Sequence, residues 1–185
     1  ARLACEVAKT RLVYVAIEAE NCVAAISKWL QLVPDKKLAL GNFIGAASTR
    51  LIRILCDECK EEYEPSPDIL KKLNIPAGKI KVMCRPGEIQ YTRGGKPILC
   101  DKCQSVGYYG RTAVLESFVL NEQTAAEIAA AESIKEMAAI LRRKGVKFVL
   151  ERTTDKLADG ITSVNEMVRI LKPAATQSQT SKSQE

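Results

Sequence analysis

Residues 51–59 read Leu-Ile-Arg-Ile-Leu-Cys-Asp-Glu-Cys, and residues 97–103 read Pro-Ile-Leu-Cys-Asp-Lys-Cys. Each stretch ends in a Cys-x-x-Cys pair, Cys56 with Cys59 and Cys100 with Cys103. One pair lets two thiolates converge on a single ion, and two pairs supply the four ligands that a structural Zn²⁺ binds in a tetrahedron. No position is then left for water, so we expect a structural zinc site.

Other states are open for these four cysteines: reduced structural thiols, an iron site, or two disulfides. A redox Cys-x-x-Cys normally accompanies a thioredoxin-like pattern, which this sequence lacks. The 40 residues between Cys59 and Cys100 exceed the usual zinc-ribbon spacing, and an inserted helix and hairpin would account for them. Metal binding would offset the entropy of closing so long a loop.

The sequence has three further cysteines, Cys5, Cys22 and Cys84, and none belongs to a Cys-x-x-Cys pair. Cys5 and Cys22 lie among alanines and apolar residues, so we expect both in a hydrophobic core. Cys84 lies between the two pairs and could act as a surplus ligand.

The first 55 residues alternate between helical and strand patterns. The predicted elements are a helix over 1–9, a strand over 11–19, a helix over 22–32, a helix from 36 to roughly 48 and a strand over 51–55. The continuous apolar run 12–17 is typical of a strand buried on both faces of a parallel sheet. Asn21 and Asp35 are the expected helix caps. This order indicates part of an α/β domain. Because the first helix has no start signal, we expect the chain to be a fragment of a longer protein.

After Cys56 the sequence becomes charged and proline-rich, and from Asn121 it becomes helical. The predicted elements are a helix over 66–73, strands over 79–85, 88–92, 98–100 and 111–120, and helices over 122–132, 133–145, 149–158 and 163–171. Ser66 and Asn121 are further expected helix caps, and Ser133 and Ser163 each begin a capping-box pattern. Gly107, Gly110 and the tyrosines between them are expected to form a compact loop.

Composition limits the possible functions. Of 185 residues, 46% are hydrophobic and 27% charged, which is typical of a globular protein, and no apolar run approaches the roughly 20 residues that span a bilayer. Residues 1–9 lack the features of a signal peptide, so a reducing compartment is expected. The net charge of +6 is spread along the chain and is interpreted as solvated surface charge. The absence of histidine excludes Ser-His-Asp triads and histidine metal ligands.

The order of motifs carries a family resemblance. They are residues 51–56, Cys59, residues 100–103, the sequence Gly-Tyr-Tyr-Gly-Arg-Thr at 107–112, Glu116, and residues 160–163 before the last helix. This order resembles the C-terminal part of the secretion superfamily ATPases, the type II secretion and type IV pilus assembly motors (GspE/PilB family). The resemblance extends up to Pro173.

The resemblance implies a hexameric ATPase with a RecA-like (P-loop NTPase) core, which uses ATP and Mg²⁺ and works with an inner-membrane platform protein. It implies a cytoplasmic location, with peripheral attachment to the inner membrane through partners. On this interpretation the fold is an α/β fragment of that core, followed by a small tetracysteine zinc module and an α-helical C-terminal segment. The expected divisions are the C-terminal remainder of the core at 1–55, the zinc module at 56–112, the helical domain at 113–172 and a disordered tail at 173–185.

Several features depart from the family pattern. The phosphate-binding motif G-x-x-x-x-G-K-[ST] is absent, and residues 41–48 lack its lysine. The acidic Walker B segment would precede Ala1. The family's histidine box aligns with 16–21, where Glu18 occupies the histidine's position. We therefore assign no catalytic or cofactor-binding residue and expect no ATP hydrolysis by this chain alone. Glu18 and Glu20 are alternatively plain carboxylates facing solvent.

Two other functions are possible. The chain could be a degenerate, non-catalytic scaffold paralogue, as the missing phosphate loop and Glu18 would suggest. It could instead be a zinc-ribbon nucleic-acid-binding module, because Arg85, Arg93, Lys96 and Lys102 form a basic cluster. Aromatic content is only 5% and no dense basic helix is present, so we do not expect a nucleic-acid partner. Arg50, Arg53 and Arg111 are candidates for subunit or phosphate contacts, and Arg111 could alternatively brace the glycine loop.

Overall fold

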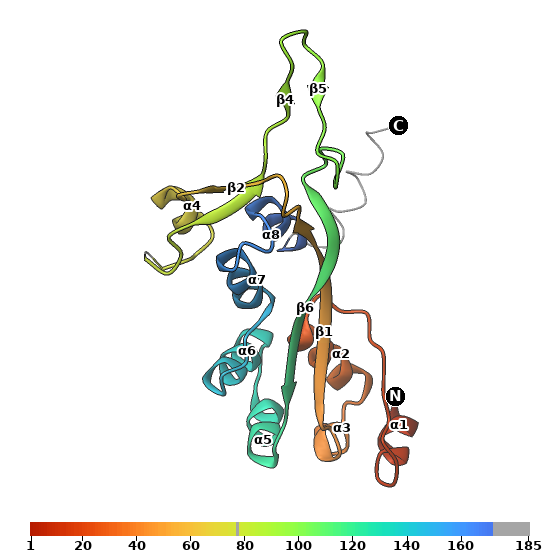
Figure 1. Cartoon of the computed structure of the whole chain (residues 1–185). Coiled ribbons are helices and arrows are strands. Elements are labelled where there is room, and N and C mark those ends of the chain that lie inside the picture. The colour runs from red at the N-terminus through yellow and green to blue at the C-terminus, as the bar shows by residue number, and fades with distance from the viewer. Residues whose placement is uncertain (77, 172–185) are drawn as a thin grey trace. The chain divides into compact units, whose positions relative to one another are not determined.

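The computed structural model describes residues 1–76 and 78–171 (Figure 1). The expected disordered tail at 173–185 lies outside these residues. The chain divides into two compact units, each built from two stretches of sequence. Unit 1 contains residues 1–49 and 115–149, and unit 2 contains residues 50–114 and 150–185. The fold is mixed α/β, and its sheets are small.

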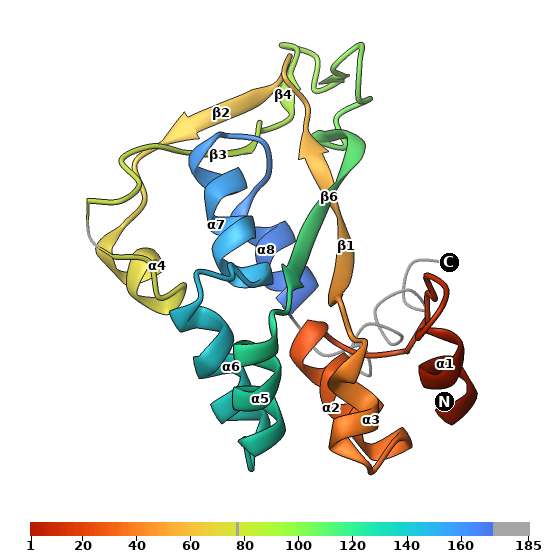
Figure 2. The same cartoon turned by 90° about the horizontal axis from the view of Figure 1, so that it is seen from below.

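Two long strands, β1 (Gly45–Leu55) and β6 (Tyr108–Val119), pair in a two-stranded sheet, and each contributes residues to both units. Their arrows run in opposite directions in Figure 2. Along residues 114–119 of β6 and Leu120, which directly follows it, buried and exposed side chains alternate strictly, which is the period of a strand with one covered face.

Unit 1 adds helices to these strand segments. They are α1 (Arg2–Val7), α2 (Cys22–Leu32), α3 (Lys36–Gly41), α5 (Glu122–Ala130) and α6 (Ile134–Arg143). The predicted caps are confirmed: the side chains of Asn21, Asp35, Asn121 and Ser133 each accept a hydrogen bond from the amide three residues later.

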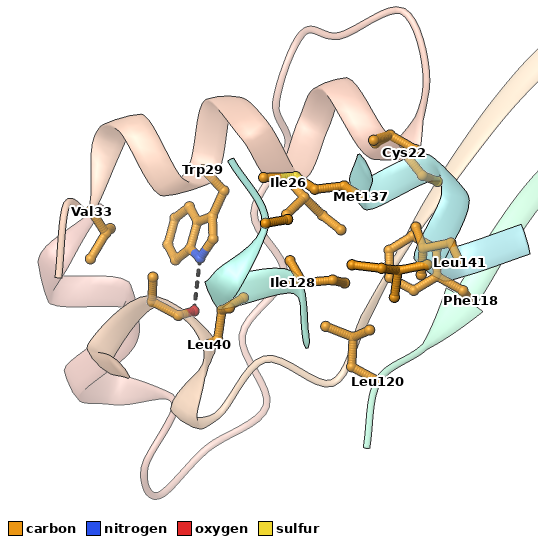
Figure 3. Packing of buried hydrophobic residues seen from close by; sticks show 14 of the residues in the cluster. Cys22, Ile26, Trp29, Val33, Leu40, Phe118, Leu120, Ile128, Met137 and Leu141 are labelled. Atoms are coloured by element: carbon orange, nitrogen blue, oxygen red, sulfur yellow. Dashed lines mark hydrogen bonds between the residues drawn. The ribbon is translucent and has the colours of Figure 1, made fainter. Parts of the chain in front are cut away.

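The core of unit 1 forms where α2, α5 and α6 meet β6 (Figure 3). Ile26, Ile128 and Leu141 are almost completely excluded from water. Trp29 is also buried, and its indole N–H donates to the carbonyl of Ala39 at 2.9 Å, so burying the ring leaves no polar atom unpaired. Cys5 and Cys22 lie in this core, as the sequence predicts.

The strand predicted over 11–19 is wrong for this structure. These residues have no regular secondary structure, and Leu12, Tyr14 and Val15 are 65%, 88% and 48% exposed. An apolar strand of this kind needs hydrogen-bonded neighbours on both edges. Within 1–76 and 78–171 no strand pairs with it, so the pattern alone does not form a strand.

The predicted helix at 36–48 ends early, because α3 stops at Gly41 and β1 begins at Gly45. A Cβ at Gly45 would come within 2.2 Å of the Phe118 carbonyl oxygen, so the backbones of β1 and β6 approach closely there. The Leu120 amide also donates to the Ile44 carbonyl at 2.8 Å. Tertiary pairing thus overrides the weak helical pattern of residues 42–48.

Unit 2 combines the other ends of β1 and β6 with short elements. They are β2 (Lys60–Tyr63), α4 (Pro67–Lys72), β3 (Met83–Pro86), β4 (Gln90–Tyr91), β5 (Pro97–Ile98), α7 (Val149–Ala158, whose first residue belongs to unit 1) and α8 (Val164–Leu171). β2 pairs antiparallel with β3, and β4 pairs antiparallel with β5. Its core cluster is Ile75, Ile80, Met83, Leu157 and Met167.

The sequence did not predict β2, whose residues Lys-Glu-Glu-Tyr resemble a loop. Its pairing with β3 forms the strand, and Tyr63 faces Met83 in the register. The inserted helix and hairpin expected between the cysteine pairs are present as α4 and the β4–β5 hairpin. None of the helices in the described ranges combines the length and apolar content needed to cross a bilayer.

Glu116 is a buried carboxylate that connects two helix starts in unit 1. Oε1 accepts from the Cys22 amide at 2.8 Å and Oε2 from the Val149 amide at 3.2 Å, and these are the first residues of two helices. Amides at helix N-termini have no intrahelical partner and favour negative charge. Burial and the nearby Glu116 raise the pKa of Cys22 to about 12. The Cys22 thiol therefore stays protonated and donates to the Glu116 carbonyl.

Replacing the carboxylate with an amide in Glu116→Gln leaves one helix-start amide facing an N–H₂ group. We expect the free energy of unfolding to fall by about 1–3 kcal/mol. Urea unfolding of the full chain measures this, with Ser117→Ala, at an exposed neighbouring position, as the control. Equal stability of Glu116→Gln and the unsubstituted chain would contradict this role.

Candidate metal centre

The four paired cysteines lie at the ends of strands in unit 2. Cys56 directly follows β1, Cys59 directly precedes β2, and Cys100 and Cys103 lie between β5 and β6. Each pair sits in a tight turn closed by backbone hydrogen bonds, from the Lys60 amide to the Cys56 carbonyl and from the Gln104 amide to the Cys100 carbonyl. The strand ends thus bring both pairs to one place.

The four sulfur atoms lie within 4.8 Å of one another. Cys56 Sγ is 3.8 Å from Cys100 Sγ, and Cys59 Sγ is 3.5 Å from Cys103 Sγ. Zinc–sulfur bonds in a tetrahedral site place the sulfurs about 3.8 Å apart. All four cysteines are free thiols, two buried and two half-buried. The donor set therefore fits a metal ion such as zinc, and the sulfurs need little movement to bind it.

The backbone next to the centre favours negative charge on one sulfur. The Gly107 amide donates to Cys103 Sγ at 3.3 Å. Burial raises the pKa of Cys56 and of Cys59. Burial acts in the same direction on Cys103, but hydrogen bonds from the Gly107 amide and the neighbouring thiols outweigh it and lower the pKa of Cys103 to about 7. Metal ligands must be deprotonated, and the hydrogen bond from the Gly107 amide favours the thiolate form of Cys103.

Gly107 holds a conformation that few other residues could adopt. Its φ is +79°, and an added Cβ would come within 2.4 Å of the Pro86 Cβ. Its carbonyl accepts from the Cys56 amide at 3.0 Å. One peptide segment therefore contacts both cysteine pairs.

Cys84 does not join the four sulfurs. It lies in β3, and a Cβ at Gly160 would come within 2.9 Å of its Sγ, so it packs against the turn before α8. Tyr108, Tyr109 and Gly110, expected in a compact loop, are instead the first residues of β6. Their pairing with β1 extends the strand up to the metal centre.

The basic cluster considered for nucleic acid is partly neutralised. Arg85 pairs with Glu61 at 3.2 Å, and Lys102 pairs with Asp57 at 2.7 Å across the two cysteine turns. These ion pairs reduce the positive charge that phosphates would meet. Glu18 and Glu20 are both exposed.

A buried ionic network is the feature that the sequence did not reveal. Glu166 was expected only in a capping box, and its amide does donate to the Ser163 hydroxyl at 3.3 Å. Its carboxylate, however, is fully buried and accepts from Arg53 Nε at 2.7 Å and Arg169 Nε at 3.0 Å. Arg53 is a charged residue within the apolar run 51–55, and this break in the run was the available signal.

Comparison with known proteins supports the sequence interpretation. The family model described as type II/IV secretion system protein matches residues 2–169. The type IV pilus assembly ATPase PilB of Thermus thermophilus is 31% identical over 169 residues, covering 91% of this chain and 18% of that protein. Type II secretion system protein E of Pseudomonas aeruginosa is 26% identical over 86% of this chain and 29% of that protein. Type II secretion system ATPase E of Vibrio cholerae is 26% identical, and the match covers 87% of this chain and 30% of that protein. The chain thus spans less than a third of the length of these relatives.

Removing one sulfur ligand tests the metal site. The purified chain should carry about one zinc ion, and Cys56→Ser should carry less than half as much, because three thiolates bind zinc far more weakly than four. Elemental analysis after gel filtration measures this. Cys84→Ala is the matched control and should keep its zinc. Full zinc in Cys56→Ser, or none in the unsubstituted chain, would contradict the site.

The buried carboxylate predicts a specific pH dependence. Burial raises the pKa of Glu166, but hydrogen bonds from Arg169 and Arg53 outweigh it and lower the pKa to about 2, from an ordinary value of 4.5. Ionised Glu166 therefore stabilises the fold above about pH 4.5, and this contribution declines as the pH falls toward 2.

We expect Glu166→Gln to be less stable than the unsubstituted chain by about 3 kcal/mol near neutral pH. The difference should shrink by roughly half or more near pH 3. Chemical unfolding at matched pH values measures it, and taking the difference cancels the loss of metal that acid causes in both proteins. A difference that stays constant with pH would contradict the assignment.

Proposed function

This chain belongs to the type II/IV secretion system protein family, and we propose that it is the zinc-bearing C-terminal portion of a hexameric ATPase that drives type II secretion or type IV pilus assembly. The observation that carries the proposal is the convergence of the four sulfurs inside the region that the family model matches. We assign residues 1–55 to the C-terminal remainder of a RecA-like core, residues 56–112 to the zinc module and residues 113–172 to the helical domain.

The proposed role of the centre is structural. Bound Zn²⁺ would supply four metal–thiolate bonds through Cys56, Cys59, Cys100 and Cys103 and would leave no site for a substrate. The four cysteines would thereby hold together the ends of β1 and β6 and the bases of β2 and of the β4–β5 hairpin. The small apolar core of unit 2 supports this role, because metal binding adds folding free energy where apolar burial is limited.

The motor chemistry requires groups that residues 1–185 do not contain. Phosphoryl transfer depends on loop amides, a lysine and Mg²⁺ ligands, and this sequence has no Walker A motif. We therefore propose that ATP and Mg²⁺ bind elsewhere in an intact parent protein. The alternative of a degenerate scaffold paralogue rests on the missing phosphate loop and on Glu18, which the family resemblance aligns with a histidine.

We place the parent protein in the cytoplasm, attached to the inner membrane through its partners. In this proposal the parent assembles as a hexamer and contacts the cytoplasmic domain of a membrane platform protein. The resemblance to pilus assembly and secretion ATPases motivates these partners.

The purified chain should release phosphate from ATP at the rate of buffer alone. Turnover well above buffer, in a sample free of contaminating ATPases, would contradict the assignment of the catalytic groups.

The partner is tested with the full-length parent and the cytoplasmic domain of its platform protein by sedimentation or calorimetry. Binding by the parent, weakened in Cys56→Ser and kept in Cys84→Ala, is the expected result. No binding by the intact parent would reject the partner.

A further inference from the structure

One residue links the four-cysteine centre to the last described helix of unit 2. Tyr108 directly follows Gly107, whose amide donates to Cys103 Sγ and whose carbonyl accepts from the Cys56 amide. Both ends of the Gly107 residue are therefore tied to metal ligands. A movement of the sulfurs would therefore be transmitted to the start of β6, where Tyr108 lies.

Tyr108 makes two contacts on the side of α8. Its hydroxyl lies 2.6 Å from the hydroxyl of Ser163, the residue just before α8. Its ring lies against the guanidinium of Arg53, with 4.0 Å from the Arg53 Cζ to the ring centroid. This cation–π contact helps to hold the guanidinium of Arg53 in place.

Arg53 in turn holds the buried carboxylate of α8. Its side chain donates to Glu166 Oε1 and its backbone amide donates to Glu166 Oε2 at 3.0 Å. Arg169 supplies the second cation and also donates to the Leu51 carbonyl at 3.0 Å. A fully buried carboxylate that loses one cation becomes costly to bury. If Arg53 moved away from Glu166, burying this carboxylate would cost free energy, and the packing of α8 would be weakened.

The segment entering α8 is tied to the same strand. The Leu55 amide donates to the Ile161 carbonyl at 2.9 Å, and the Thr162 hydroxyl donates to the Arg53 carbonyl at 2.9 Å. β1 ends at Leu55, one residue before the ligand Cys56. Two strands therefore connect the metal centre to the contacts of α8: β1, which is followed by Cys56, and β6, which begins at Tyr108.

We propose that Tyr108 is a positioning residue that couples metal occupancy of the four-cysteine centre to the docking of α8, through Arg53, Ser163 and Glu166. With the sulfurs held together, Tyr108 keeps Arg53 against Glu166 and α8 stays docked. With the sulfurs released, the start of β6 shifts, the carboxylate loses a partner and α8 opens more often. This inference rests on the proposed binding of zinc.

Hydrogen–deuterium exchange of the full chain tests the coupling. Removing zinc with a chelator should speed exchange of the peptide 163–171 about tenfold, the effect of losing roughly one charged hydrogen bond. The peptide 134–143 of unit 1 serves as the internal reference and should change little. In Tyr108→Leu, which should still bind zinc, exchange of 163–171 should already be fast, and zinc removal should add less than about twofold.

Two further variants make the result specific. Tyr108→Phe keeps the ring over Arg53 but loses the bond to Ser163, so its zinc-dependent change should be smaller than that of the unsubstituted chain. It also carries the test if Tyr108→Leu does not fold. Tyr109→Leu is the matched control, since Tyr109 is exposed and its ring faces Lys102, and it should keep the full zinc dependence.

The outcomes separate the coupling from the metal site. Zinc bound at the four sulfurs, with exchange of 163–171 unchanged by its removal, would overturn the coupling and leave the metal site intact. Full zinc dependence in Tyr108→Leu would also overturn it. A chain that binds no zinc at all would overturn the metal site and the coupling together.

Discussion

Unit 2 depends on bringing four thiols together from two turns that lie 40 residues apart in the chain. Closing that loop costs conformational entropy, and the elements inside it are too short to offset the cost alone. β2 and β3 have four residues each, and β4 and β5 have two. A metal ion bound by the four sulfurs would supply folding free energy that these short elements lack.

The buried ionic network adds a second constraint. Glu166 is satisfied entirely within unit 2, by two arginines and a backbone amide. A buried ion pair does not in general stabilise a protein more than apolar residues of similar volume. Separating its partners, however, costs a large free energy. The network therefore fixes the register of α8 against β1. Tyr108 directly follows Gly107 of the metal centre and contacts Arg53 of the network.

Local signals predicted much of this structure. Helix caps such as Asn21, Ser66 and Ser133 were readable because a cap needs only the amide three residues away. The Cys-x-x-Cys pairs were readable because their chemistry is encoded in the spacing. Features that depend on distant partners were not. Arg53 meets Glu166 across 113 residues, and neither residue alone signals the other. The apolar run 11–19 failed for the opposite reason, since its strand pattern has no partner within the described ranges.

The division of the chain has a consequence for how it folds during synthesis. Residues 1–49 complete their core only with residues 115–149, and residues 50–114 complete theirs only with the segment that begins at Leu150. Neither unit can complete its core until the ribosome has synthesised residues beyond 114. Contacts of such long sequence separation form slowly and leave apolar surface exposed meanwhile. The nascent chain therefore passes through a period in which both cysteine turns have been synthesised but α7 and α8 have not.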